Sequence, residues 1–198
     1  MEDRNDSERP TGRSAGTEAA EDDPTDCDAV DVGGADGPSI TVERPEMDAV
    51  DALVDLWVAL ASDQRAYGSH VLPAANRQSV RETLARQVVG GGVRVARCDG
   101  ELVGFVSFDL ERDSYERDAT RGVVRNVYVV AEYRGRGVGT RLMDAAESAL
   151  CERGASVLSL EAMAGNDRAR EFYRERGYSP HRVQFERPVE NDTHSKED

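Results

Sequence analysis

The residues most suited to chemistry lie in one loop that is rich in glycine and arginine. The stretch NVYVVAEYRGRGVGTRLMDAAE, residues 126–147, begins as an apolar, β-branched run and ends in a helical pattern. Between the two stand Arg134, Gly135, Arg136, Gly137 and Gly139. Small residues let consecutive backbone N–H groups converge on a phosphate, and the N-terminus of the following helix adds partial positive charge. The loop, with charge pairing from its two arginines, therefore predicts an anion-binding site.

Three phosphate-binding patterns compete for this loop. A nucleotide-triphosphate P-loop needs a lysine, which the loop lacks. A dinucleotide fingerprint needs a third glycine where Thr140 stands, so this pattern, and with it a nucleotide-dependent oxidoreductase, is the weaker alternative. The pattern Gln/Arg-x-x-Gly-x-Gly/Ala is met in full by Arg134, Gly137 and Gly139. A strand-to-helix turn with incidental glycines is the structural alternative.

Hydrophobic periodicity and turn residues predict the elements that position this loop. The expected strands span residues 39–45, 93–98, 102–111, 122–130, 156–162 and 181–189. The expected helices span residues 47–61, 77–89, 138–150 and 166–176. Asp99 and Gly100 form a hairpin-turn dipeptide between the second and third strands. The order β-α-α-β-β-β-α-β-α-β predicts an α/β sandwich built on one mixed sheet.

The charge distribution divides the chain into one domain and two tails. Residues 1–38 hold 12 acidic and 3 basic residues, a net charge of -9, and almost no large apolar side chains. Such a segment cannot bury enough surface to offset its ordering entropy, so we expect a disordered acidic tail. Residues 39–189 are expected to form the folded domain, and residues 190–198 a short C-terminal tail.

Composition also limits the possible partners and location. The net charge is -14, and of the 25 basic residues only Lys196 is a lysine. This resembles the proteomes of salt-loving organisms, in which acidity reflects solvation in brine rather than a cationic substrate. We expect no membrane span, because no run of 18 apolar residues occurs, and no secretion signal. Nucleic-acid binding is disfavoured because no basic helix or basic–aromatic patch stands out.

The cysteines indicate a cytoplasmic protein. Cys27, Cys98 and Cys151 are odd in number and widely spaced, so they match neither a disulfide framework nor a C-x-x-C metal site. We expect a reducing compartment and no metal.

A second motif, which begins 26 residues after Arg134, points to a family. The segment LEAMAGNDRAREFYRERGY, residues 160–178, has a strand, an Asn, a helix with a Tyr, and then Gly-aromatic. Together with VYV and YRGRGVGT it resembles the GNAT superfamily of N-acetyltransferases over residues 39–187. The resemblance implies a mixed, mostly antiparallel central sheet flanked by helices, with acetyl-CoA as co-substrate.

The resemblance also implies the residues that bind acetyl-CoA. Val127, Tyr128 and Val129 would lie along the pantetheine arm, with the N–H of Val129 facing the thioester carbonyl. The pyrophosphate would be held by the loop and the first helical turn. Its expected ligands are Arg134, Gly135, Arg136, Gly137, Val138, Gly139 and Thr140. Asn166 would contact the arm. The chain departs from the family at Ala131, where a proline is frequent.

Acetyl transfer to an amine needs a base, an oxyanion donor and an acid for the leaving thiolate. Tyr173 is the candidate acid, and its alternative is aromatic packing beside Phe172. Glu161 is the candidate base, because the local segment resembles ribosomal-protein alanine N-acetyltransferases. Asp109, Glu111 or an ordered water is the alternative base, and an exposed strand-end carboxylate is the structural alternative for Glu161.

The expected function is an acetyl-CoA-dependent N-acetyltransferase that acts through a ternary complex on a primary amine. The amine could belong to a small molecule, a protein N-terminus or a lysine. A non-catalytic acyl-CoA-binding module is the alternative. The loops that would shape the acceptor site contain Tyr67, Ser69, His70 and Tyr115, but they do not identify the acceptor. Both a monomer and a homodimer are compatible with the sequence.

Overall fold

The computed structural model of the protein describes residues 39–111 and 116–189. The predicted tails at residues 1–38 and 190–198, and Tyr115 of the acceptor loops, lie outside the described residues. The domain boundaries therefore stay predictions.

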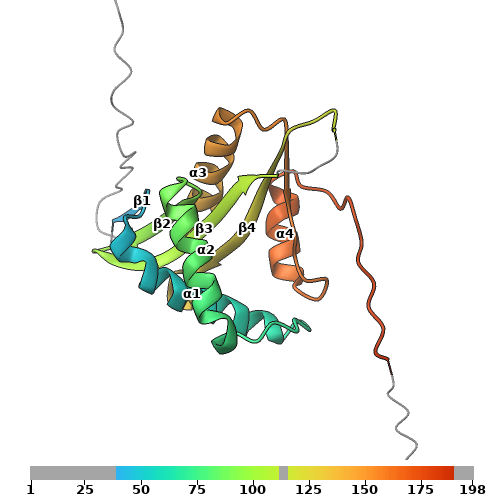
Figure 1. Ribbon diagram of the computed structural model, residues 1–198, viewed down its shortest axis with the longest axis horizontal. Coiled ribbons are helices and arrows are strands. Elements are labelled where there is room, and N and C mark those ends of the chain that lie inside the picture. Colours follow the sequence, from blue (N-terminus) through green and yellow to red (C-terminus); the bar gives the residue numbers. More distant parts are fainter. Residues whose placement is uncertain (1–38, 112–115, 190–198) are drawn as a thin grey trace, which may run out of the picture.

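The centre of the molecule is one five-stranded sheet with the strand order β1-β2-β3-β4-β5 (Figure 1). Its strands are β1 (Ile40–Glu43), β2 (Val93–Cys98), β3 (Glu101–Leu110), β4 (Arg121–Val129) and β5 (Val157–Leu160). The first four strands pair antiparallel in sequence order, and β5 joins parallel to β4. The predicted α/β class with a mixed, mostly antiparallel sheet is confirmed.

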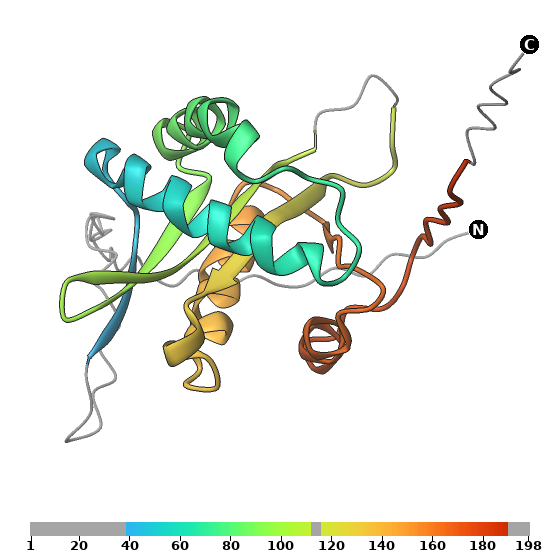
Figure 2. The same ribbon diagram turned by 90° about the horizontal axis from the view of Figure 1, so that it is seen from below.

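Helices cover both faces of the sheet (Figure 2). They are α1 (Val50–Arg65), α2 (Arg77–Val89), α3 (Val138–Glu152) and α4 (Asp167–Glu175), with short 3-10 turns at Met47–Ala49, Ala74–Asn76 and Ala131–Tyr133. Leu53 of α1 and Leu84 of α2 pack on Phe105 on one face. Leu142 and Leu150 of α3 pack on Phe108 on the other face, which α4 also contacts through Phe172.

The central strands are apolar on both faces because each face has its own core. In β2, Val93 and Val95 belong to the α1/α2 core, whereas Ala96 and Cys98 belong to the α3 core. Ordinary strand alternation places Val93 and Val95 on one face and Ala96 and Cys98 on the other. The long apolar runs that predicted these strands thus reflect burial on both sides.

The turn between β2 and β3 forms as predicted. Asp99 and Gly100 have φ values of 49° and 86°, both in the left-handed region. A two-residue hairpin whose central residues both have positive φ matches the right-handed twist of the flanking strands. This local signal was sufficient to place the hairpin.

The predicted closing strand at residues 181–189 is wrong. These residues form neither helix nor strand, and the side chain of Phe185 is 90% exposed. The alternation of apolar and polar residues is that of a strand, but a strand also needs a neighbour to complete its hydrogen bonds. Here the segment leaves the body of the domain after α4 (Figure 1), so the element order ends with α4.

Within residues 39–111 and 116–189, none of the helices has the length and the apolar content needed to span a bilayer.

Candidate active site

The site begins where β4 loses one of its two neighbours. β4 pairs with β5 only from Arg121 to Val124, because β5 ends at Leu160. On its other side β4 stays paired with β3 as far as Val129, which lies opposite Gly104. The second half of β4 therefore has a backbone edge that faces a gap instead of a strand.

Pleating decides which backbone groups face this gap. The N–H of Val130 donates to the carbonyl of Val103 at 2.9 Å, so residue 130 points toward β3. Because successive strand residues alternate, the backbone groups of Val127 and Val129 point away from β3 and into the gap. The carbonyl of Val129 accepts a hydrogen bond from Arg134 Nε at 2.8 Å. The N–H of Val129 is thus directed to the open side.

The glycine loop brings the start of α3 to the same gap. Gly135 and Gly137 have φ values of 76° and 78°, a left-handed conformation that glycine adopts without strain. Gly137 stands directly before α3, and no side chain caps this helix. The first amides of an α-helix have no intrahelical acceptor. The turn therefore presents free N–H groups and the positive end of the helix dipole, which is the arrangement expected of an anion site.

The two loop arginines have different surroundings. Arg134 forms an ion pair with Asp63 of α1 at 2.9 Å, and its guanidinium lies 5.4 Å from the ring centroid of Tyr128. Its contacts with Asp63 and with the Val129 carbonyl hold the loop against α1 and β4. Arg136 instead lies over the ring of Tyr133 at 5.4 Å. Of the two predicted phosphate partners, Arg134 is already engaged by a carboxylate of the chain.

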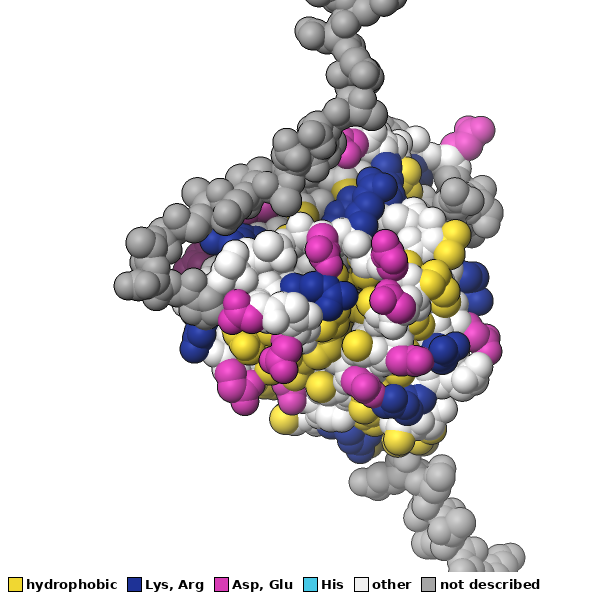
Figure 3. Space-filling view, turned by 90° about the vertical axis from the view of Figure 1, so that its left-hand side faces the viewer, with side chains coloured by type: hydrophobic (Ala, Val, Ile, Leu, Met, Phe, Trp, Pro, Cys, Tyr) yellow, Lys and Arg dark blue, Asp and Glu magenta, His cyan; other side chains and the backbone are white. Residues whose placement is uncertain are grey.

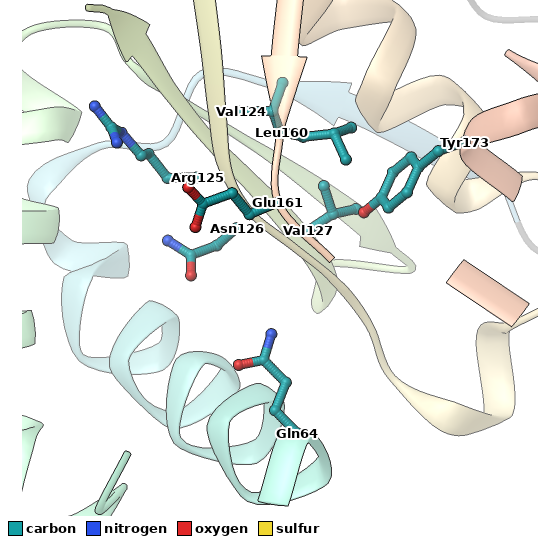
Figure 4. A pocket seen from close by; sticks show the side chains of 8 residues that line it. All are labelled: Gln64, Val124, Arg125, Asn126, Val127, Leu160, Glu161 and Tyr173. Carbon is teal, nitrogen blue, oxygen red and sulfur yellow. The ribbon is translucent and has the colours of Figure 1, made fainter. Parts of the chain in front are cut away.

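A small, open pocket lies between β4, β5, α1 and α4 (Figure 4). It is lined by Gln64, Val124, Arg125, Asn126, Val127, Leu160, Glu161 and Tyr173. The side chain of Tyr173 reaches from α4 toward the centre of the pocket, with its hydroxyl directed toward Val127 (Figure 4). The structure thus brings both candidate catalytic residues into one pocket, next to the open edge of β4.

The environment of Tyr173 keeps its hydroxyl protonated. Burial raises the pKa of the Tyr173 phenol above its ordinary value. Its neighbour Phe172 is directed to α3, where its Cζ lies 3.7 Å from the position that a Cβ would have at Gly139. The two adjacent aromatic side chains therefore serve different contacts, and only Tyr173 lines the pocket.

The three candidate carboxylates differ in their partners. Glu161 follows β5 directly, is exposed, and points toward Asn126 and Arg125 in the pocket (Figure 4). Asp109 is paired with Arg125 at 3.1 Å, and Glu111 with Arg121 at 3.0 Å. Neither Asp109 nor Glu111 lines the pocket. Geometry therefore favours Glu161 among the three.

Five lining residues were missed by the sequence analysis: the polar Gln64, Arg125 and Asn126 and the apolar Val124 and Leu160. The amide of Asn126 donates from Nδ2 to Ser107 Oγ at 2.8 Å, and Ser107 is fully buried. This bond fixes the Asn126 side chain at the inner wall, facing Gln64 of α1 across the pocket (Figure 4). The sequence does show one polar residue inside each of two apolar strands, Ser107 and Asn126. Their pairing could not be predicted, because it depends on the strand register that places them opposite each other.

Asn166 has a structural role that the sequence analysis did not predict. Its Oδ1 accepts a hydrogen bond from the N–H of Ala169 at 3.1 Å, so it caps the N-terminus of α4. The Nδ2 group of the same amide is the part that could bind a ligand. Asn166 therefore supports the helix that carries Tyr173.

The described acceptor-loop residues, Tyr67, Ser69 and His70, lie outside the pocket lining. The ring of Tyr67 comes within 3.8 Å of the position that a Cβ would have at Gly165, so the α1–α2 loop approaches the loop before α4. Ser69 Oγ accepts from the N–H of Val71, and His70 Nε2 lies 3.4 Å from Glu186. In the described part of the chain no group of three or more His, Cys, Asp or Glu is arranged to hold a metal ion.

Sequence comparison identifies relatives of this arrangement. The sequence profile of the acetyltransferase (GNAT) family matches residues 53–178, which is more than half of the chain. An uncharacterized N-acetyltransferase of Archaeoglobus fulgidus is 40% identical over 82 residues, which are 41% of this chain and 56% of that protein. N-alpha-acetyltransferase 30 of Schizosaccharomyces pombe is 31% identical over 83 residues, 37% of this chain and 55% of that protein. The chain spans about half the length of these curated relatives.

Solved structures share the fold at low identity. A GCN5-related N-acetyltransferase from Ralstonia eutropha has a TM-score of 0.62 at 23% identity, covering 76% of this chain and 98% of that one. An aminoglycoside N-acetyltransferase in complex with CoA has a TM-score of 0.60 at 14% identity, covering 78% and 98%. At these identities the likeness shows the fold alone.

The capping and ligand-binding roles of Asn166 can be separated by two substitutions. Asn166→Ala removes the acceptor for the Ala169 N–H and should lower the free energy of unfolding by about 1 kcal/mol in urea titrations. Asn166→Asp keeps an acceptor oxygen and should retain most of this stability. Both variants lose Nδ2. If Asn166 also contacts the pantetheine arm through Nδ2, both should bind acetyl-CoA more weakly, and in the Asp variant this weaker binding should occur at near-normal stability. Equal destabilisation in both variants would contradict the capping role.

Proposed function

The chain belongs to the acetyltransferase (GNAT) family, and from this premise we propose that it transfers an acetyl group from acetyl-CoA to a primary amine by direct attack within a ternary complex. The observation that carries the proposal is the meeting of three features at one gap. These are the open edge of β4 at Val127 and Val129, the uncapped start of α3, and the partly buried side chain of Tyr173.

The donor site fits the parts of acetyl-CoA in order. The pyrophosphate would lie against the amides from Gly135 to Thr140, where the helix dipole favours negative charge. The pantetheine arm has amide groups and would add to the open edge of β4 like a short strand. A bound thioester would then have its carbonyl beside the N–H of Val129, close to the pocket that holds Glu161 and Tyr173.

The chemistry then follows from the pocket residues. Glu161 accepts a proton from the incoming ammonium group, whose pKa is about 10 as for a lysine. The freed amine nitrogen attacks the thioester carbonyl carbon, and the N–H of Val129 donates to the oxyanion that forms. The C–S bond then breaks as the amide forms, and the leaving sulfur takes the proton of the Tyr173 hydroxyl. The attacking nitrogen loses its second proton, which returns to the Tyr173 oxygen through solvent, and Glu161 releases its proton to solvent. The products are the acetylated amine and the free thiol of CoA.

Burial helps Tyr173 in this role. The raised pKa of Tyr173 keeps the phenol protonated across the neutral range, so the proton is present when it is needed. Partial desolvation also destabilises a thiolate that forms beside Tyr173, which increases the affinity of the sulfur for a proton. The transfer therefore accompanies the breaking of the C–S bond.

The pocket lining indicates the charge of the acceptor but not its chemical class. Gln64, Asn126 and Glu161 give the wall opposite Tyr173 a polar and anionic character, which suits a cationic primary amine. A small-molecule amine, a protein N-terminus and a lysine all satisfy this requirement. The aminoglycoside and N-alpha-acetyltransferase relatives make the first two classes the natural ones to test.

Release of CoA tests the proposed function. The full chain is incubated with acetyl-CoA and a panel of aminoglycosides, diamines and peptides with free N-termini, and the new thiol is measured at several KCl concentrations. Amine-dependent thiol release is the expected result. Saturable binding of acetyl-CoA without release for any amine would support a non-catalytic acyl-CoA-binding module instead.

Tyr173→Phe tests the acid. The ring is retained and the hydroxyl is lost, so kcat should fall about 100-fold while the dissociation constant of acetyl-CoA changes little. Because the pKa of Tyr173 is raised, the wild-type rate should not decline through this group as the pH rises from 7 to 9. The rate should be lost through deprotonation of Tyr173 only at pH values above the ordinary pKa of tyrosine. An unchanged kcat in the Phe variant would disprove this assignment.

Glu161→Gln tests the base against its rival. The variant should lose at least about tenfold in kcat at pH 7, and part of the loss should be recovered at higher pH, where more of the amine is already neutral. Asp109→Asn is the matched control, because Asp109 is occupied by Arg125 and lies outside the pocket lining. A larger loss in Asp109→Asn than in Glu161→Gln would reverse the assignment.

A further inference from the structure

Three arginines gather at the C-terminal end of α3. The glycine loop lies at the opposite, N-terminal end of that helix. They are Arg44, just after β1, Arg94 in β2, and Arg153, just after α3. Arg94 is only 9% exposed and is the single charged side chain that is buried among residues 39–111 and 116–189. A buried charge is costly unless something compensates it, so the surroundings of Arg94 need an explanation.

The three guanidinium groups meet around Gly91. Arg94 Nη1 donates to the carbonyls of Gly91 and Val93 at 3.1 and 2.9 Å, and Arg153 Nη2 donates to the Gly91 carbonyl at 2.6 Å. A Cβ placed on Gly91 would lie 3.1 Å from Arg153 Nη2 and 4.0 Å from Arg44 Nη1. Arg94 and Arg153 also each lie 5.4 Å from the ring centroid of Phe108. The cluster is therefore a compact group of three positive charges.

This cluster lacks the carboxylate partners that many arginines of the chain have. Such pairs are Arg77–Asp55, Arg81–Asp51, Arg97–Glu43, Arg121–Glu111, Arg125–Asp109, Arg134–Asp63 and Arg176–Asp144. Isolated arginines such as Arg136 and Arg141 instead contact an aromatic ring or a backbone carbonyl, so the distinction of the cluster is that three unpaired guanidinium groups lie together. No ion pair joins Arg44, Arg94 or Arg153 to any acidic side chain in the described ranges.

The pKa of Arg94 indicates that positive charge at the cluster is incompletely compensated. Burial lowers the pKa of Arg94, and the neighbouring charges of Arg44 and Arg153 lower it further, against a smaller opposing effect of Glu152. Figure 3, which shows the side of the molecule that faces left in Figure 1, shows Arg side chains and Asp and Glu side chains interspersed on that surface. A carboxylate group is the chemical complement of such a cluster, because guanidinium groups bind its two oxygens in a bidentate fork.

The chain itself supplies a source of carboxylates. Residues 1–38 carry a net charge of -9 and lead directly into β1. Arg44 follows the four residues of β1, which span about 13 Å at ~3.3 Å per residue, so Arg44 lies about that far from the start of the strand. The densest acidic run, EDDPTDCD at residues 21–28, ends 12 residues before Ile40, and a coil of that length spans about 19 Å. The acidic run can therefore reach the cluster without strain.

We propose that the Arg44–Arg94–Arg153 cluster is a carboxylate-binding site and that its occupant is the acidic segment of residues 21–28 of the same chain. The bound carboxylates neutralise a cluster that packs against the end of α3 and the start of β2. The site is separate from the acetyl-transfer pocket, so this inference does not depend on the proposed function.

Two native cysteines provide the test. Cys27 lies between Asp26 and Asp28 in the acidic run, and Cys151 is exposed two residues before Arg153. Oxidation of the full chain with copper–phenanthroline should form a Cys27–Cys151 disulfide within one chain, detected by peptide mapping without reduction. Arg44→Gln should slow this reaction about tenfold, as expected from the loss of one charge-assisted hydrogen bond. Arg44 is exposed, so the variant should fold normally by circular dichroism.

Controls distinguish the alternatives. Arg174→Gln removes an exposed arginine of α4 far along the chain and should leave the rate unchanged. Equal rates in wild type, Arg44→Gln and Arg174→Gln would overturn the proposal. A disulfide-linked dimer would assign the site to the segment of a second copy. Thermal stabilisation by inorganic phosphate at constant ionic strength, with no effect of Arg44→Gln on cross-linking, would instead indicate a site for small oxyanions.

Discussion

The site depends on the early end of β5. β4 keeps its hydrogen bonds with β3 along its whole length, but its parallel partner stops at Leu160. A parallel pair is connected by a crossover helix, so α3 must begin at the end of β4, and α4 must begin beyond the end of β5. The open backbone edge, the first amides of α3 and the helix that carries Tyr173 are therefore brought together by one topological feature.

Local patterns in the sequence were sufficient for most of the fold and for part of the site. The helix at Arg77–Val89, the strand at Val93–Cys98 and the turn at Asp99–Gly100 each follow from short-range signals, and all were predicted. The closing strand was not, because its formation depends on a partner that no local pattern specifies. Likewise Arg134 binds Asp63, 71 residues away in the chain, and Asn126 binds Ser107 across a sheet register that contains a bulge. These contacts are decided by the assembled sheet.

The position of Tyr173 also depends on charged residues at the C-terminal end of α4. Arg176 binds Asp144 and Glu147 of α3, the latter at 2.9 Å, and the hydroxyl of Tyr178 donates to Glu147 at 3.0 Å. Burial and the nearby Glu147 raise the pKa of Tyr178, so it stays a donor. The rings of Tyr173 and Tyr178 are 6.1 Å apart. In an acidic chain that is rich in arginine, this network ties α4 to α3 and so holds the catalytic candidate in place.

The gap beside β4 has a consequence for the behaviour of the protein without its ligand. An exposed edge of β-branched residues such as VYVV is a template for pairing with strands of other chains, and most proteins place such edges at the rim of a sheet and shorten or charge them. Here the edge lies beyond the end of β5 and is flanked by α1 and α4. These helices would shield the edge from strands of other chains, so protection from aggregation and the proposed binding of the pantetheine arm would share one stretch of backbone.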